Sequence, residues 1–269
     1  RARANRTTEG FAKVLADARP LPAEKAALHD AAWRVLAADI VALRTQPPFP
    51  AAAMDGYAVA DSDARQGAEL DLIGESAAGR RFNGKIESGQ AVRIFTGAPV
   101  PEGADSVIMQ EDVERLDGHR IRIAREVTPA RHVRRRGLDF AEGELLLRAG
   151  TVLDAATLPL AAAGGHAVLP VHRRPVVAIL ATGDELVAPG EITGPDQIVA
   201  SNGFGIAAMV RKAGSTVIDL GIVADDKDKI STAVADAVAQ GADILVTLGG
   251  ASVGDHDLIK PVLAGLGVE

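Results

Sequence analysis

The sequence predicts a multidomain fold in which a parallel α/β domain is combined with a β domain. From Val176 onward, apolar runs of strand length alternate with stretches of helical periodicity, as in repeated β-α units of a sheet covered by helices. From about Glu69 to Glu126, short alternating runs are separated by glycine and proline clusters, which is typical of a small β sandwich or barrel. The 269 residues suffice for two or three domains.

The last β-α unit, residues 242–258, is the stretch around which the chain is organised. Residues 244–248 form an unbroken apolar run, which predicts a strand covered on both faces in the middle of a parallel sheet. Gly249 and Gly250 end the run, and apolar residues at helical spacing follow Gly254. The α/β region is expected to have strands over 176–181, 216–220 and 244–248, with helices over 202–213 and 225–240 and after Gly254.

The turn after this strand suits a phosphate or another oxyanion, because glycines let backbone N–H groups converge where a helix begins. Asp255 and Asp257 beside it would suit a bound Mg²⁺, but an ordinary tight turn capped by Asp255 explains the same residues as well. The residue directly after Gly254 is Asp255 and not a lysine, so the turn is not a Walker A loop. A G-x-S-x-G pattern surrounds Ser252, but the only later histidine, His256, is too close to complete a hydrolase triad.

Composition narrows the class of protein. Aromatic residues make up only 3% of the chain, which argues against base-stacking platforms for single-stranded nucleic acid. The net charge of -7 argues against a general binder of nucleic acid or membrane surfaces. The chain has no cysteine, which excludes disulfides and thiolate zinc sites. No secretory signal or membrane-spanning run is evident, and we expect a cytoplasmic protein.

The N-terminal half is expected to begin with helices over 8–18 and 24–38, where apolar residues recur at helical spacing. Prolines then keep the chain extended up to the turn at Asp55, and a short strand follows over 57–60. Further strands are expected over 70–73, 91–95, 106–109 and 120–124, and a short helix over 155–163. Thr96 opens a rigid, proline-containing loop that can present its hydroxyl in a fixed place. Plain turn chemistry is the competing interpretation for Asp55, and a plain hairpin connection is the competing interpretation for the loop of Thr96.

Residues 131–140 are the most basic piece of the chain. In an acidic protein without another basic stripe, a site for a small polyanion is a better interpretation of this run than a nucleic-acid interface. Asp139 lies beside these arginines, so it could simply pair with them, or it could be a metal-binding or catalytic carboxylate.

Three segments that follow predicted strands carry carboxylates or glycines: residues 182–185, 225–226 and 249–257. Ligands of open parallel sheets bind at the carboxyl ends of the strands, so these segments are expected to meet on one rim. Together they predict a Mg²⁺-phosphate site. No G-x-G-x-x-G is present, so a dinucleotide-binding fold is not indicated.

Five motifs occur in the order found in one known family. They are P-P-F-P-A-A-A-M-D-G-Y-A-V, T-G-A-P-V-P-E-G-A-D, R-R-R-G-L-D, A-T-G-D-E-L and L-G-G-A-S-V-G-D-H-D. Over nearly its whole length the chain resembles the MoeA/gephyrin E-domain family of molybdopterin molybdenumtransferases. The resemblance implies Mg²⁺-dependent insertion of molybdate into adenylylated molybdopterin, with release of AMP.

The family's architecture assigns the changes in composition to domains. A parallel α/β domain of the molybdopterin-binding, MogA-like type would span 172–269, and an inserted β domain would span 47–137. A small mixed α+β linker domain would be formed by 19–46 and 138–171, and a helix over 1–18 would pack near the α/β domain. The family continues beyond the last residue of this sequence. The α/β domain is therefore expected to be incomplete here, and the family's C-terminal β domain to be absent.

The resemblance also implies partners. The family forms homodimers in which the active crevice lies between the α/β domain of one subunit and the β domain of the other. Asp55 and Thr96 would then serve the site of the partner subunit. A small pterin is the expected substrate, the preceding adenylyltransferase is a candidate partner, and neither nucleic acid nor membrane is expected.

Residues at the family's motif positions give the candidate site. The candidate catalytic residues are Asp55, Thr96, Asp139, Glu185, Asp225 and Asp257. The candidate ligand-binding residues are Thr182, Gly183, Gly249, Gly250, Ser252 and Gly254. Glu185, Asp225 and Asp257 would hold Mg²⁺ or position the molybdate and the pyrophosphate, with the glycine turn on the terminal phosphate. Asp55, Thr96 and Asp139 would orient the anionic ligand or the attacking oxygen.

Two other functions remain open at this point. A molybdopterin adenylyltransferase shares the α/β domain but would not need the segments around Asp55 and Thr96. A gephyrin-like scaffold that binds a receptor peptide would not need the set of carboxylates.

Overall fold

The computed structural model describes residues 18–126, 128, 130–249 and 258–266, together with residues 10, 12, 15 and 16. The described chain forms two compact units. The first combines the residues up to Ala37 with those from Leu169 onward, and the second comprises residues 38–168. The predicted helix over 8–18 lies largely outside the described residues, and the division into four domains stays a prediction. None of the described helices has both the length and the apolar character needed to cross a membrane.

The first unit is built on a three-stranded parallel sheet, as predicted. Its strands are β13 (Val176–Thr182), β16 (Thr216–Val223) and β17 (Ile244–Leu248), in the order β16-β13-β17. Both neighbours of β13 run parallel to it, so all three carboxyl ends lie at the same edge of the sheet.

The expected place of β17 in the sheet is wrong. Within the described residues β17 pairs only with β13 and is an edge strand, with Ile244 51% exposed. The central strand is β13, in which residues 177–180 are all buried. An unbroken apolar run shows that a strand has apolar neighbours on both faces, but the order of strands depends on crossovers that the run itself does not encode.

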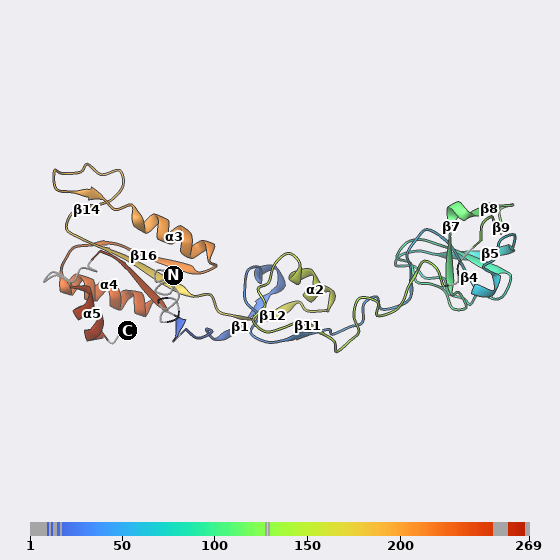
Figure 1. The fold of residues 1–269 in the computed structure, drawn as a ribbon, viewed down its shortest axis with the longest axis horizontal. Helices are drawn as coiled ribbons and strands as arrows, with labels where there is room; N and C mark the ends of the chain where they lie inside the picture. The colour runs from blue at the N-terminus through green and yellow to red at the C-terminus, as the bar shows by residue number, and fades with distance from the viewer. Residues whose placement is uncertain are drawn as a thin grey trace, which may run out of the picture. The chain divides into compact units, whose positions relative to one another are not determined.

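Helices cover both faces of this sheet (Figure 1). Helix α3 (Asn202–Lys212) lies on one face, and α4 (Lys227–Ala239) and α5 (Ile259–Leu266) lie on the other. The α4–α5 face carries the core cluster of this unit: Leu180, Ile230, Val234 and Ile259. The expected helices over 202–213 and 225–240 are confirmed to within two residues at each end.

A β-bulge interrupts the pairing of β16 with β13. Ile179 is opposite Asp219, but Ala181, two residues on, is opposite Ile222, three residues on. The extra residue is accommodated by Gly221, whose φ of +71° favours glycine, and the Asp219 carboxylate accepts a hydrogen bond from the Gly221 N–H at 3.0 Å. Beyond the carboxyl end of β13, β14 (Leu186–Val187) and β15 (Ile198–Val199) pair as a small parallel arm.

The helix predicted over 24–38 is wrong. This segment contains β1 (Ala23–Ala27) and a single 3₁₀ turn, Leu28–Asp30, and β1 pairs with β12 (Val168–His172). Leu36 also bridges to Val171, and the buried Arg34 guanidinium bonds to both Glu24 and the His172 carbonyl oxygen. Pairing with a segment more than 130 residues away overrides the alanine-rich helical periodicity.

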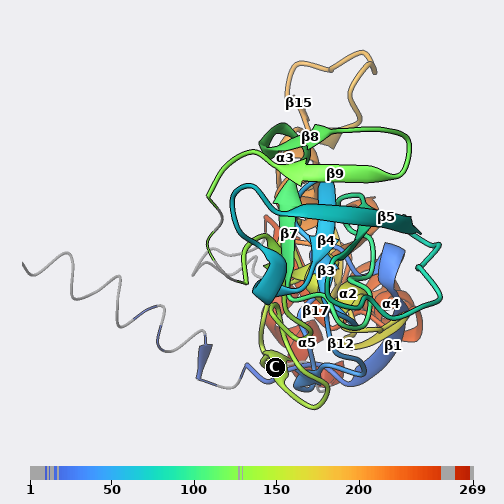
Figure 2. The same ribbon diagram turned by 90° about the vertical axis from the view of Figure 1, so that its right-hand side faces the viewer.

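The second unit contains the predicted β structure, a six-stranded sheet in the order β7-β4-β6-β5-β9-β8. The strands are β4 (Gly56–Val59), β5 (Glu69–Ser76), β6 (Gln90–Ile94), β7 (Ser106–Met109), β8 (Val113–Arg115) and β9 (Arg120–Ile123). Strands β4 and β7 run at a steep angle to β5 and β9, so the sheet curls (Figure 2). Two apolar clusters, one around Ile108 and Ile121 and one around Val92 and Ile94, form its core.

Short elements complete this unit. Strand β2 (Ile40–Val41) pairs with β11 (Leu145–Leu147), and β3 (Ala51–Ala52) pairs with β10 (Val133–Arg134). The predicted short helix is α2 (Thr157–Ala163). Two 3₁₀ turns, Asp61–Asp63 and Gln110–Asp112, follow β4 and β7.

Candidate functional site

The loops that follow β13 and β16 are joined at the carboxyl edge of the parallel sheet. The Gly183 N–H donates to the Val223 carbonyl oxygen at 3.3 Å, and the Asp225 N–H donates to Asp184 Oδ1 at 3.1 Å. The predicted meeting of residues 182–185 with residues 225–226 is therefore seen. Asp226 has a local role instead, because its side chain caps α4 by accepting from the Asp228 and Lys229 N–H groups.

A cavity of about 430 Å³ opens at this edge. It is lined by the ends of β13 and β17, by the β14–β15 arm and by the start of α3, and includes Thr182, Glu185, Asn202 and Gly249. The Thr182 side chain is only 3% exposed, and among the described residues its Oγ1 has no hydrogen-bond partner. A buried hydroxyl without a partner is costly unless a further group completes its hydrogen bonding.

Gly249 begins the glycine turn and faces Thr182. Its φ is +103°, a conformation that favours glycine, and a Cβ at this position would overlap the Thr182 carbonyl oxygen and lie 3.1 Å from Thr182 Oγ1. The turn therefore passes the end of β13 at a distance that only glycine permits. The other predicted members of the turn, Gly250, Ser252, Gly254, Asp255 and Asp257, lie outside the described residues.

Glu185 is the carboxylate that lines this cavity. Its side chain folds back over Gly183, where a Cβ would overlap the Glu185 carboxylate. Asp225 lies on the neighbouring loop of the same edge and is exposed. In the described part of the chain, no three histidine or carboxylate side chains gather as a metal site. Mg²⁺ is commonly held by one or two carboxylates and the ligand's phosphates, so Glu185 and Asp225 fit such an ion only in company with a ligand or with residues not described.

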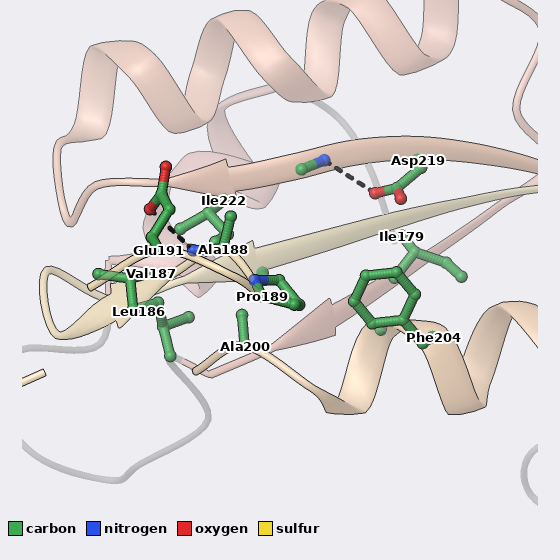
Figure 3. A pocket seen from close by; sticks show the side chains of 13 residues that line it. Ile179, Leu186, Val187, Ala188, Pro189, Glu191, Ala200, Phe204, Asp219 and Ile222 are labelled. Carbon is green, nitrogen blue, oxygen red and sulfur yellow. Dashed lines mark hydrogen bonds between the residues drawn. The ribbon is translucent and has the colours of Figure 1, made fainter. Parts of the chain in front are cut away.

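An apolar cavity of about 460 Å³ adjoins the first. Figure 3 shows the side chains that line it. The two cavities share Ala181, Leu186, Ala200 and Gly203. Ile179 and Ile222 from the sheet form one wall, the 186–191 loop another, and the ring of Phe204 from α3 closes a third side. Its two carboxylates are committed locally, with Asp219 bonded to Gly221 and Glu191 to the Ala188 N–H at 3.1 Å.

In the second unit, Asp55 and Thr96 form a close pair across 41 residues of sequence. Asp55 Oδ1 accepts hydrogen bonds from the Thr96 N–H at 2.8 Å and from the Thr96 hydroxyl at 2.7 Å. The backbone bond, the hydroxyl bond and the nearby Arg93 charge, in that order of importance, lower the pKa of Asp55 below its ordinary value. The carboxylate is exposed, ionised at neutral pH and fixed in direction, which a plain turn does not require.

Asp139 forms no hydrogen bond with any of these groups among the described residues. It is exposed, its N–H donates to the Gln46 carbonyl oxygen at 3.0 Å, and among the residues that the structure describes it forms no salt bridge with the arginines of 131–136. The pairing interpretation of Asp139 is therefore not supported. Its catalytic role stays a prediction.

The sequence interpretation missed three residues near these sites. Ser201 and Asn202 at the start of α3 were not assigned to the site, but both line the cavity beside Thr182. Arg93 was not singled out, although it contacts the aromatic residues that flank Asp55 and Thr96. An arginine placed among apolar residues within a predicted strand was the available signal.

Comparisons with known proteins agree with the motif order. A family model described as "MoeA N-terminal region (domain I and II)" matches residues 6–165, and one described as "Probable molybdopterin binding domain" matches residues 178–269. The molybdopterin molybdenumtransferase of Haemophilus influenzae is 40% identical over 248 residues, which cover 92% of this chain and 61% of that protein. That of Bacillus subtilis is 35% identical over 257 residues, which cover 91% of this chain and 59% of that protein.

A solved structure is also similar. The crystal structure of the molybdopterin biosynthesis MoeA protein from Pyrococcus horikosii has a TM-score of 0.80 at 33% identity, covering 96% of this chain and 66% of that one. The chain thus spans about 60% of the length of the curated relatives it matches. With the first family model matching more than half of its residues, the chain belongs to the MoeA family.

Proposed function

We propose that this protein inserts molybdenum from molybdate into adenylylated molybdopterin and releases AMP. The observation that carries the proposal is the cradle formed by Thr182 and Gly249 at the carboxyl edge of the parallel sheet. Support comes also from the relatives named molybdopterin molybdenumtransferase, which match most of this chain.

The cradle fits an oxyanion. The buried Thr182 hydroxyl has a hydrogen to donate and no described acceptor, and Gly249, which carries no side chain, lies directly against Thr182. The N-terminal end of α3 lines the same cavity and contributes positive potential. A ligand phosphate in this cavity would complete the hydrogen bonding of Thr182.

The apolar cavity beside the cradle would accept the uncharged ring system of the same ligand. It shares four lining residues with the cradle's cavity, so a single molecule can occupy both. Glu185 and Asp225 would hold Mg²⁺ together with ligand phosphates. The ion supplies charge compensation for the phosphates when bound.

The Asp55–Thr96 pair supports insertion rather than adenylylation. Two hydrogen bonds fix the carboxylate in the β sheet, and an adenylyltransferase built on the α/β domain alone would not need it. We assign Asp55 and Thr96 to orientation of the anionic ligand or the attacking oxygen.

The test measures two reactions of the full-length protein: AMP release with molybdenum insertion, and consumption of ATP with unadenylylated pterin. We expect the first and not the second. Thr182→Val and Gly249→Ala should each lower molybdenum insertion at least about tenfold, since the first removes a hydroxyl donor to the oxyanion and the second places a Cβ against the Thr182 carbonyl oxygen and displaces the cradle. Gly205→Ala, in α3 where a Cβ meets nothing within 4 Å, is the matched control and should retain activity.

Three results would count against the proposal. Consumption of ATP in place of the adenylylated pterin would identify an adenylyltransferase. Normal insertion by Thr182→Val and Gly249→Ala would remove the cradle from the site, and binding of a peptide without any insertion would favour a scaffold.

We also propose that the protein acts as a homodimer whose site takes residues from both subunits. The test mixes two inactive variants, Asp55→Asn and Glu185→Gln. Recovery of roughly a quarter to a half of normal activity on mixing is expected from the shared-site arrangement, because mixed dimers regain one intact site. Mixing that restores nothing would contradict it.

A further inference from the structure

We infer that Arg93 is a positioning residue that holds the Asp55–Thr96 pair in its working geometry from the opposite side. The proposal that this geometry serves the reaction rests on the proposed function. The proposal that Arg93 maintains it does not.

Arg93 lies on β6 and stands directly opposite Tyr57 on β4. Its guanidinium lies over the Tyr57 ring at 5.1 Å and over the Phe95 ring at 4.8 Å. Tyr57 is two residues after Asp55, and Phe95 directly precedes Thr96. One planar cation therefore contacts the chain next to each member of the pair.

Hydrogen bonds fix the guanidinium in this position. Nη1 donates to the Gly56 carbonyl oxygen at 3.0 Å, and Nη2 donates to Gln110 Oε1 at 2.7 Å. Gln110 in turn donates its N–H to the Asp55 carbonyl oxygen at 3.2 Å. Arg93 thus holds the Gly56 carbonyl oxygen directly and the Asp55 carbonyl oxygen through Gln110. The Asp55 side chain is in turn bonded to Thr96.

The partners of Arg93 are all uncharged. It is half-buried, and among the described residues it appears in no salt bridge, whereas Arg120 and Arg122 on β9 of the same sheet both pair with Glu69. A buried carboxylate partner would explain a half-buried arginine by charge alone. Its partners are instead a carbonyl oxygen, a side-chain amide and two aromatic rings. These partners require the fixed N–H geometry and the planar face of the guanidinium, which a lysine does not have.

The rest of the neighbourhood is rigid. Gly56 lies so close to β7 that a Cβ would overlap the Ile108 carbonyl oxygen, and the Gly97 N–H that follows Thr96 donates to the Ala52 carbonyl oxygen at 2.8 Å. Removal of the guanidinium would therefore release the Asp55 turn and the end of β6 relative to each other without unfolding the sheet. A displacement of about 1 Å can lower a catalytic rate about a hundredfold.

The experiment compares Arg93→Met and Arg93→Lys with Arg122→Met in the full chain. Arg93→Met removes both the fork and the charge, and Arg93→Lys keeps the charge alone. Arg122→Met removes an arginine of the same sheet that pairs with Glu69 and contacts neither Asp55 nor Thr96. Two readouts are independent of catalysis: hydrogen exchange of the Thr96 amide, and titration of the Asp55 carboxyl followed by NMR. The third is the kcat and KM of molybdenum insertion.

In Arg93→Met, the hydrogen-exchange rate of the Thr96 amide should rise at least about tenfold, and the Asp55 titration should move to higher pH. The kcat of insertion should fall, while KM should stay within about twofold of normal. Arg93→Lys should show the same changes in smaller measure, and Arg122→Met none. The proposal would be overturned if Thr96 exchange and the Asp55 titration were unchanged in either Arg93 variant. If Arg93→Met does not fold, the measurements on Arg93→Lys test the proposal by themselves. Changed exchange with normal kcat would support the positioning role and would refute the catalytic assignment of Asp55 and Thr96.

Discussion

At Gly56 the backbone of β4 lies against the backbone of β7 too closely for any side chain. The Cβ of an alanine would overlap the Ile108 carbonyl oxygen and lie 3.1 Å from the Met109 Cα, both of them backbone atoms that cannot move independently of the sheet. We expect Gly56→Ala to lower the free energy of unfolding of the β sheet by about 1–3 kcal/mol or more, the usual cost of overpacking. Urea unfolding followed by circular dichroism measures it.

The matched control is Gly118→Ala. Gly118 lies in the same sheet region and is exposed, and a Cβ at this position would meet nothing within 4 Å. This substitution should change stability little. Equal losses in the two variants would show that the close approach at Gly56 is not the cause.

The Thr96 hydroxyl provides a second prediction, because it helps keep Asp55 ionised. Removal of this donor in Thr96→Val should raise the pKa of Asp55 toward its ordinary value of 3.8, while the backbone bond from Thr96 remains. Since the folded pKa is depressed, the stabilisation from these bonds is fully present above about pH 4 and is lost as pH falls through the lower, folded value. NMR titration of the Asp55 carboxyl checks the direction, and an unchanged or lower pKa would contradict it.

The site residues were predictable at this scale only in part. The sheet rule brought 182–185 and 225–226 together, since strand ends of a parallel sheet meet whatever their separation in sequence. It did not distinguish Asp225, whose side chain has no hydrogen-bond partner among the described residues, from Asp226, which caps α4. Distinguishing them requires the backbone geometry of the helix start, which the residue type alone does not specify.

Among the elements, α4 depends on its N-terminal cap. Asp226 accepts from the Asp228 N–H at 2.9 Å and from the Lys229 N–H at 3.0 Å, two donors that have no partner within the helix. Asp226→Ala should lower the free energy of unfolding by about 1 kcal/mol, whereas Asp226→Ser should retain most of it. The control Asp236→Ala, on the exposed side of α4, should cost nothing, and a loss equal to that of Asp226→Ala would exclude capping as the reason.

Strands that are marked by a distinct apolar run were predictable from that run. Strands β7 and β17 begin and end at the residues that their apolar runs define, and β13 and β16 differ from expectation only at their carboxyl ends. The structure of segment 24–38 was not predictable. It is fixed by pairing with β12 and by the bond from Arg34 to His172, both of which involve residues far away in the sequence. Periodicity describes one segment at a time and does not include such partners.

At the scale of the molecule, each compact unit has its own core. Ile230 and Val234 belong to the core of the first unit, and Ile108 and Ile121 to that of the second. Each of these isoleucines is at most 1% exposed, so Ile230→Ala and Ile108→Ala should each cost about 2–5 kcal/mol. We expect calorimetry to show two thermal transitions, with each variant lowering a different one. A common shift of both transitions would show that the units unfold together.

The extra residue at Gly221 also governs how β16 tolerates changes of length. Asp219 and Ile222 are three positions apart yet line the same apolar cavity, while Leu220 and Val223 pack against the α4–α5 side. In a regular strand, residues three positions apart have side chains on opposite faces of the sheet. Asp219 and Ile222 share a face because the bulge adds one residue between them. Deletion of Gly221 is therefore expected to leave every later side chain of β16 on its present face of the sheet. Deletion of Ile218 would instead move the side chains before it to the opposite face.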